Sequence, residues 1–158
     1  AVAMGKLSAA EAKEAVLLLD DDGRSLLHRA AAAGHLAVAK ALVEQYGADA
    51  GLKDARGLPP VFAGAEDLAV IEFLLHAPSF DAACTDLKGN GVLHLLASLE
   101  VTGNDAQRLH KLLVRTLGAG ADTNARNSEG RTALHLAAEL GRDSAVLFLV
   151  NQRGCNIN

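Results

Sequence analysis

A nine-residue pattern returns along the 158-residue chain and sets the length of its folding unit. Residues 23–31 read Gly-Arg-Ser-Leu-Leu-His-Arg-Ala-Ala, and residues 130–138 read Gly-Arg-Thr-Ala-Leu-His-Leu-Ala-Ala. A third copy spans 89–97, and a degenerate copy, Gly-Leu-Pro-Pro-Val-Phe-Ala, begins at residue 57. The leading glycines therefore lie 34, 32 and 41 residues apart. A period of this length predicts an array of stacked supersecondary units.

A second pattern recurs out of phase with the first. Residues 47–50 read Gly-Ala-Asp-Ala, and residues 120–125 read Gly-Ala-Asp-Thr-Asn-Ala. Weaker copies lie at 79–83 and 154–158. Glycine, aspartate and asparagine favour turns, so this pattern predicts the turn that closes each unit.

Together the two patterns resemble the ankyrin repeat, whose period is about 33 residues and whose signature is T-P-L-H-x-A. The resemblance covers residues 20–158, almost the whole chain. It implies an all-α solenoid of stacked helix-turn-helix units with short β-turn or hairpin fingers. The implied units are an N-terminal tail with a capping helix (1–19) and four repeats (20–53, 54–85, 86–126 and 127–158).

Local signals within the unit predict two short helices. Ser25 and Thr132 can cap a helix N-terminus, and Gly34 and Gly141 can end that helix, which places it at 27–33 and 134–140. A second helix follows, with apolar residues at helical spacing. In the first repeat they are Leu36, Val38, Ala39, Leu42 and Val43, and in the third they are Leu109, Leu112, Leu113, Thr116 and Leu117. Each helix pair has one apolar face, which only a stacked neighbour can bury.

Composition agrees with such an array. Half of the residues are hydrophobic but only 3% are aromatic, which suits thin helices that pack closely. A helix is also expected at 8–19, where Ser8 and Glu11 fit a capping box. Its apolar face would cover the open end of the first repeat as part of a partial repeat; the residues expected on that face are Ala12, Ala15, Val16 and Leu19.

Three repeats depart from the pattern. In the second, Pro59-Pro60-Val61-Phe62 replaces T-P-L-H, so we expect a short first helix that begins near Pro60. The third is enlarged by about eight residues at 98–108, which we expect to extend its first helix to Val101, followed by a loop and a cap at Asn104 or Asp105. In the fourth, the helix at 144–151 is too apolar for a free end, so we expect further repeats or a packing partner.

Recurring polar residues could suggest chemistry, but their periodicity indicates architecture. His28, His94 and His135 hold one position of the repeat, and the resemblance implies that each hydrogen bonds to a neighbouring loop. Equivalent positions in stacked helices lie roughly 10 Å apart, too far to share a metal. The pairs Ser25–His28 and Thr132–His135 recur with the repeat, unlike a catalytic nucleophile and base. We therefore expect no enzyme activity, no metal and no cofactor.

Other features exclude further classes of protein. The net charge is −4, which gives no reason to expect nucleic-acid binding. Apolar runs are short, so we expect no membrane insertion. The glycines at 118 and 120 lack the third glycine of a dinucleotide loop. Cys84 and Cys155 form no disulfide pattern, which favours a reducing compartment, the cytoplasm, the nucleus or both.

The resemblance implies a scaffold that binds another protein or a peptide through its concave face and finger loops. The partner segment is expected to be apolar with flanking charges. The implied contact residues are Asp21, Asp22, Arg24, Ala32, Ala33, Ala55, Arg56, Leu58, Leu87, Lys88, Asn90, Ser98, Leu99, Ser128, Glu129, Arg131, Glu139 and Leu140. Among them Leu58, Leu87, Leu99 and Leu140 are expected to form a row of exposed apolar anchors.

Two further expectations follow, the first from the uncovered last helix and the second from the resemblance. The chain can instead be a regulatory or targeting domain of a larger enzyme, channel or effector, packed against other domains of its own full-length protein. Asn124 matches the asparagine of the closing turn that is hydroxylated in some ankyrin proteins.

Overall fold

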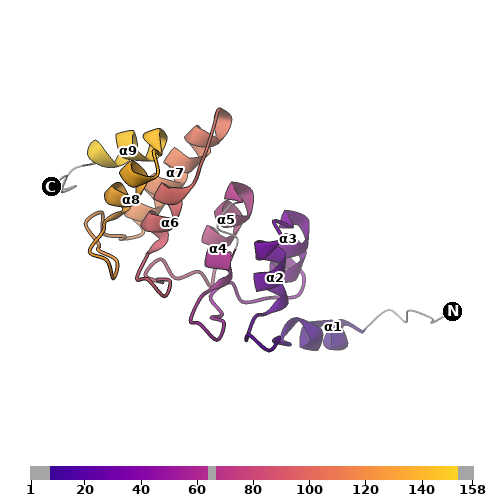
Figure 1. The fold of residues 1–158 in the computed structure, drawn as a ribbon. Helices are drawn as coiled ribbons and strands as arrows, with labels where there is room; N and C mark the ends of the chain where they lie inside the picture. Colours follow the sequence, from indigo (N-terminus) through magenta and orange to yellow (C-terminus); the bar gives the residue numbers. More distant parts are fainter. Residues whose placement is uncertain (1–7, 64–66, 153–158) are drawn as a thin grey trace.

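The computed structural model describes residues 8–63 and 67–152, and within these ranges the chain is built of helices and loops. The β-structure in this part is one isolated bridge between Thr85 and Gly91. Four helix pairs follow one another along the array (Figure 1). They are α2 (Leu26–Ala32) with α3 (Leu36–Glu44), α4 (Pro60–Ala63) with α5 (Leu68–Leu75), α6 (Val92–Ser98) with α7 (Asn104–Gly118), and α8 (Ala133–Glu139) with α9 (Asp143–Val150).

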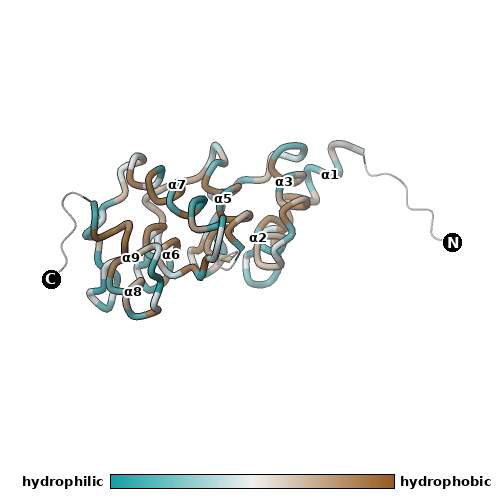
Figure 2. Tube along the Cα trace, turned by 90° about the horizontal axis from the view of Figure 1, so that it is seen from above, coloured by the Kyte–Doolittle hydropathy of each residue, from teal (hydrophilic) through white to brown (hydrophobic). Residues whose placement is uncertain are grey.

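The first helices of the pairs form one row, the inner helices, and the second helices form another row, the outer helices. Within the rows α2 packs on α4, α6 packs on α8, and α3, α5, α7 and α9 pack in sequence. The views in Figures 1 and 2 show this two-row stack, with the loops gathered below it in Figure 1. This arrangement confirms the predicted all-α solenoid.

The two predicted N-cap residues have this role in the structure. Ser25 and Thr132 are N-caps whose hydroxyl oxygens accept from the backbone N–H of His28 and His135. The side chain of each histidine also bonds to the capping residue: its Nδ1 accepts from the backbone N–H of that residue at 3.2 Å. Gly34 follows α2 at φ 72°, a left-handed conformation that favours glycine.

Small side chains fill the space between the two rows. Ala39, Ala97, Ala137 and Ala145 are fully buried, together with leucines such as Leu96. An alanine at a helix contact lets two backbones approach closely, which explains a core that is aliphatic and almost free of aromatic residues. Figure 2 shows the apolar parts of the helices turned toward the interior of the stack.

Histidines link the first repeat to the second and the third to the fourth. The Nε2 of His28 lies 2.9 Å from the carbonyl oxygen of Leu58, and the Nε2 of His94 lies 3.0 Å from that of Arg131. Since Nδ1 of each ring accepts a backbone N–H, Nε2 carries the proton and donates to the carbonyl. The histidine linkage implied by the resemblance is thus present at these two interfaces.

The second repeat is reduced, as expected. Its first helix, α4, has four residues and begins at Pro60, and Asp67 caps α5 by accepting from two backbone amides. Phe62 occupies the position of the linking histidine and is partly buried against the core. Consequently, in the part of the chain that the structure describes, no histidine links this repeat to the next one.

The enlarged third repeat differs from our prediction. Its first helix, α6, ends at Ser98, because Leu99 adopts an extended conformation and turns into the core. Arg142 donates to the carbonyl oxygen of Ser98 and fixes this end. The extra residues instead lengthen α7 to 15 residues, and its N-cap is Gly103 at φ 57°, not Asn104 or Asp105.

The two ends of the array also depart from a regular repeat. The helix α1 (Ala9–Val16) has the predicted capping box between Ser8 and Glu11. The loop before each inner helix is a finger, and the first two fingers begin at Asp20 and Asp54. The helix α1 ends four residues before the first finger, whereas the outer helix α3 ends ten residues before the second. This shorter spacing means that α1 does not occupy the position of an outer helix. Leu19, expected on a packed face, lies beyond α1 and is exposed. The tail at 1–7 and the closing turn at 154–158 lie outside the described residues.

Candidate partner-binding surface

Each finger is built around one side chain that the sequence patterns did not single out. The Oδ1 of this residue accepts two backbone amides of its own turn, at 2.8 to 3.0 Å. The four residues are Asp20, Asp54, Asp86 and Asn127. An Asx residue three positions before each finger glycine was the available signal, and it is present even in the worn second repeat.

In the first two fingers, hydrogen bonds favour the charged state of the aspartate and lower its pKa. The backbone amide of Arg24 lowers the pKa of Asp20 below its usual value. Burial acts to raise the pKa of Asp54, but the amides of Leu58 and Arg56 and the Arg56 guanidinium outweigh it, so the net pKa is lowered. The first two fingers are therefore stabilised by ionised aspartates at neutral pH.

Adjacent fingers touch in two places along the array. The N–H of Ala55 donates to the carbonyl oxygen of Asp22 at 3.0 Å, and the N–H of Ser128 donates to that of Lys88 at 2.8 Å. A Cβ on Gly23 would come within 2.8 Å of the Ala55 nitrogen, so this contact also requires glycine. The first finger is thus fixed to the second, and the third to the fourth.

The second and third fingers do not make this contact. Both lie wholly within the described residues, and no hydrogen bond joins them there. A Cβ on Gly57 would meet nothing within 4 Å. The inner helices α4 and α6 also make few contacts with each other. The surface therefore consists of two pairs of repeats with joined fingers, and the two pairs meet at a more open junction.

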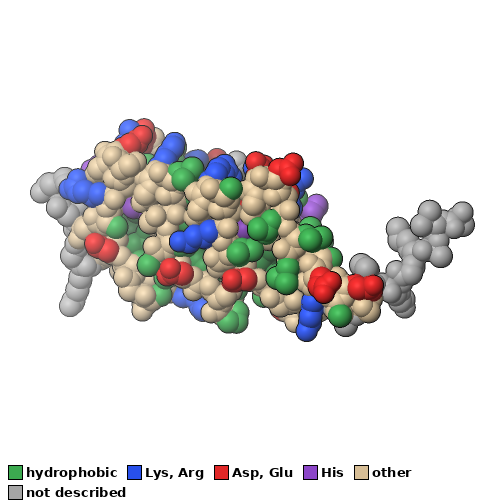
Figure 3. Space-filling view, turned by 90° about the horizontal axis from the view of Figure 1, so that it is seen from below, with side chains coloured by type: hydrophobic (Ala, Val, Ile, Leu, Met, Phe, Trp, Pro, Cys, Tyr) green, Lys and Arg blue, Asp and Glu red, His purple; other side chains and the backbone are tan. Residues whose placement is uncertain are grey.

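Most charges expected to meet a partner are paired within the chain. Arg24 pairs with Asp22 at 3.0 Å, and Arg56 pairs with Asp54 at 3.3 Å. Arg131 pairs with both Glu129 and Glu139. Among the described residues, Lys88 at the tip of the third finger forms no ion pair. On the face that carries the loops, acidic, basic and apolar side chains lie interspersed (Figure 3).

The four expected apolar anchors do not form one row. Leu87 is 68% exposed and Leu140 is 45% exposed, as an anchor requires. Leu99 was predicted wrongly: it is only 6% exposed, because it turns inward after α6. Leu58 is half-buried, and its carbonyl oxygen receives the His28 bond.

The remaining expected contact residues are spread over fingers and helix ends. The exposed ones include Ala32, Ala33 and Ala55 from the first two repeats, whereas Ser98 and Asn90 are half-buried. The side chain of Asn90 accepts from Asn127 and donates to Asp86, so it serves the finger interface. Asn124 is half-buried in the last complete turn, where its N–H donates to Asp122, and its hydroxylation remains a prediction.

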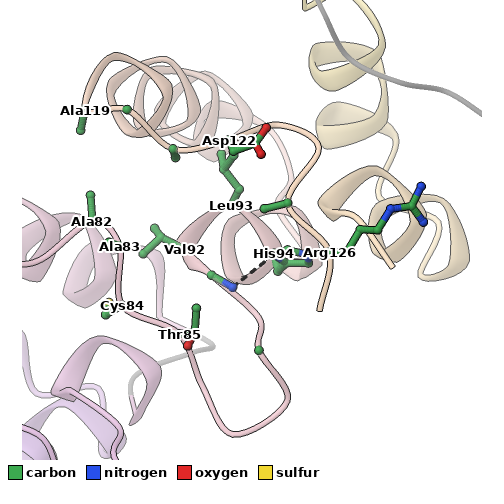
Figure 4. Close-up of a pocket in the computed structure, with 15 residues that line it drawn as sticks. Ala82, Ala83, Cys84, Thr85, Val92, Leu93, His94, Ala119, Asp122 and Arg126 are labelled. Carbon is green, nitrogen blue, oxygen red and sulfur yellow. Dashed lines mark hydrogen bonds between the residues drawn. The ribbon is translucent and has the colours of Figure 1, made fainter. Parts of the chain in front are cut away.

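A pocket of about 310 Å³ lies beside the start of α6 (Figure 4). Figure 4 shows Ala82, Ala83 and Val92 on one side of it and Ala119 and Asp122 on the other. Cys84 also lines it, and burial raises the pKa of that thiol to about 11, which makes it a poor nucleophile at neutral pH. The lining is mostly alanine and glycine and offers no converging set of reactive groups.

The serine–histidine pairs have a structural role in this arrangement. In the Ser25–His28 pair both ring nitrogens are engaged, one by the cap and one by Leu58. Across residues 8–63 and 67–152, no three His, Cys, Asp or Glu side chains gather as a metal site would require. No described helix is both long and apolar enough to span a membrane.

Comparison with known proteins agrees with this geometry. A family model described as ankyrin repeats, in three copies, matches residues 61–158, and a single ankyrin repeat matches residues 22–55. The chain is 34% identical over 136 residues to human SH3 and multiple ankyrin repeat domains protein 2. It is 33% identical over 135 residues to mouse neurogenic locus notch homolog protein 1.

Both matches cover 84% of this chain but only 7% and 5% of the respective relatives, so the chain spans a small part of their length. The family models by themselves match most of the residues from 22 onward. They cover the helix pairs α2–α3, α6–α7 and α8–α9 completely, and the pair α4–α5 except for Pro60. The chain therefore belongs to the ankyrin repeat family.

Proposed function

We propose that this chain is a non-catalytic recognition module that binds a partner protein or peptide through its fingers and the exposed side of its inner helices. Ankyrin repeats are generally protein–protein interaction modules, and they generally lack catalysis. The exposure of Leu87 on the third finger and Leu140 at the end of α8 is the observation that supports this surface most directly. Exposed leucines beside charged groups are typical of a contact region.

The charge arrangement supports a partner segment that is apolar with flanking charges. Arg24, Arg56 and Arg131 are already held by acids of the same chain, so they present ordered, nearly neutral polar groups. Lys88, which is exposed next to Leu87 and forms no ion pair among the described residues, is a cation available to an acidic group of the partner. A short helix or extended segment with an acidic residue beside an apolar one would match this pair.

A display library of 16-residue peptides, selected on the immobilised chain, would test the surface. Leu87→Glu and Leu140→Glu should each weaken the selected peptides at least tenfold, since each places a charge in the apolar contact. Val38→Glu and Val114→Glu are matched controls, because these valines are similarly exposed on the outer helices α3 and α7. Circular dichroism would verify folding, and equal loss in all four variants would contradict the assignment.

A second candidate role is that of a regulatory or targeting domain within a larger protein. The small share of each relative that this chain covers favours it. An antibody against the chain would reveal the mass of the native protein, and peptide mass spectrometry would identify any fused domain. We also propose a cytoplasmic or nuclear location, supported by the lack of a disulfide pattern; imaging with the same antibody would test it.

A further inference from the structure

The last helix pair exposes a face that is buried at two other places in the array. Leu27, His28 and Ala31 of the first repeat are buried under the second, and Leu93, His94 and Ala97 of the third are buried under the fourth. The equivalent residues of the fourth repeat are Leu134, His135 and Ala138. Leu134 is half-buried, and His135 and Ala138 are exposed.

His135 is held in the same orientation as the two linking histidines. Its Nδ1 accepts from the backbone N–H of Thr132 at 3.2 Å and lies 2.7 Å from the Thr132 hydroxyl. Nε2 therefore carries the proton, as in His28 and His94. Among the described residues, this Nε2 has no hydrogen-bond partner, whereas those of His28 and His94 each meet a finger carbonyl.

The finger and the second helix of the fourth repeat are open on the same side. The carbonyl oxygen of Glu129 is equivalent to those of Asp22 and Lys88, which accept an amide from the next finger. A Cβ on Gly130 would meet nothing within 4 Å, whereas Gly89 lies against Ser128. Val150 of α9 is exposed as well, whereas the equivalent Val43 of α3 is half-buried; Leu147 is exposed too, and it stands where α3 has the exposed Lys40.

We infer that the α8–α9 face docks one more ankyrin-type repeat, whose finger supplies a carbonyl oxygen for His135 Nε2 and an N–H for the Glu129 carbonyl. This occupant follows from continuity, since the same groups make the interfaces of the first and second and of the third and fourth repeats. It explains why a polar ring and an apolar helix side share one exposed face.

A second copy of this chain fits the face poorly. Head-to-tail stacking would place the first finger of the second copy, with Asp20, Asp21 and Asp22, next to Glu129 in the fourth finger of the first copy. Asp20, Asp22 and Glu129 are each paired with an arginine of their own repeat, but Asp21 forms no ion pair among the described residues and would add an uncompensated carboxylate to this contact. The helix α1 also lies beside the first repeat at the level of the loops (Figure 1). Self-association is therefore the competing outcome that the experiment must detect.

The experiment adds a copy of residues 125–158 after Asn158, which keeps the register because 154–158 corresponds to 120–124. Docking should raise the Tm by about 5 °C or more, since each buried interface stabilises a repeat array. The Nε2 proton of His135 should become visible in a 1H–15N NMR spectrum, as that of the buried His94 should be in the original chain, because burial slows exchange with water.

His135→Ala provides the matched test. In the original chain it should change the Tm by no more than about 1 °C, and in the extended chain it should remove much of the gain. Equal effects in both chains, an added segment without helical signal, or a dimer of the original chain in analytical ultracentrifugation would each overturn the inference. Leu147→Lys, which restores the α3 pattern, keeps both chains soluble should the extended one aggregate.

Discussion

Arg108 of α7 and Glu72 of α5 form the ion pair that joins the second repeat to the third. Both Nε, at 3.1 Å, and Nη2 of Arg108 donate to Oε2 of Glu72, and this bond raises the pKa of the guanidinium. Within residues 8–63 and 67–152 no other side-chain hydrogen bond crosses this junction, and the backbone link there is the bridge between Thr85 and Gly91. The outer helices therefore carry the connection that histidines and fingers carry at the neighbouring interfaces.

Removing this pair should loosen the junction selectively. Glu72→Gln should lower the free energy of unfolding by about 0.5–1 kcal/mol, the range for a half-exposed ion pair with good geometry. Hydrogen exchange of α4 and α5 should quicken more than that of α8. Asp105→Asn is the control, because Asp105 pairs with the same arginine but within α7. Equal responses from the two variants would show that Glu72 does not bridge the repeats.

Restoring the missing histidine should strengthen the same junction, but only together with its cap. Pro59 has no N–H to donate to an imidazole Nδ1 and no hydroxyl to cap α4. Phe62→His alone should therefore destabilise the fold through lost apolar burial. Pro59→Thr with Phe62→His should recover about 1 kcal/mol relative to the single variant, through a bond to the Asn90 carbonyl oxygen. Denaturant unfolding of both variants would measure this difference.

The linking histidines should differ sharply from the unlinked one. His94→Ala leaves the carbonyl oxygen of Arg131 with one partner fewer and opens a cavity, so it should cost about 2–4 kcal/mol. His135→Ala should cost less than about 1 kcal/mol, since His135 is exposed and, among the described residues, its side chain bonds only within its own cap. Urea titration followed by circular dichroism would rank them, and comparable losses would contradict the linking role of His94.

Acid should weaken the fingers through Asp54. Its pKa in the fold is below that of an unfolded Asp, about 3.9, so its contribution is present above that pH and disappears as pH falls through the folded pKa. Asp54→Asn should flatten the loss of stability below about pH 4, and the fold should tolerate it because Asn127 fills the same position. Asp21→Asn, at an exposed fingertip, is the control and should leave the loss of stability at acidic pH unchanged.

Alkali should weaken the fold through Cys84. The pKa of its thiol is raised to about 11 in the fold, above the unfolded value of about 8.5. The folded state therefore retains the proton longer, and stability should fall as pH rises from about 8.5 to 11. Cys84→Ala should remove that part of the decline while leaving the neutral-pH fold intact. Identical alkaline slopes in the two proteins would show that Cys84 does not titrate with unfolding.

Much of the array follows from the order of the residues, because its signals are local. Ser25, Thr132 and Gly34 define helix ends within one turn of the chain, and the period places successive pairs. The candidate surface was only half predictable. Leu87 and Leu140 are exposed as expected, but Leu99 was misplaced because its burial depends on the extended backbone after α6 and on Arg142 from the next repeat.

The sequence by itself determined the helical repeat, its caps, its turns and the shortness of α4, since each depends on residues only a few positions apart. Only the tertiary structure decided which interfaces are closed. Phe62 could be read as a missing histidine, but whether Gly57 faces a neighbouring finger or open space depends on how two whole repeats settle against each other. The packing of one repeat on the next is set by contacts between residues thirty or more positions apart, as between Glu72 and Arg108.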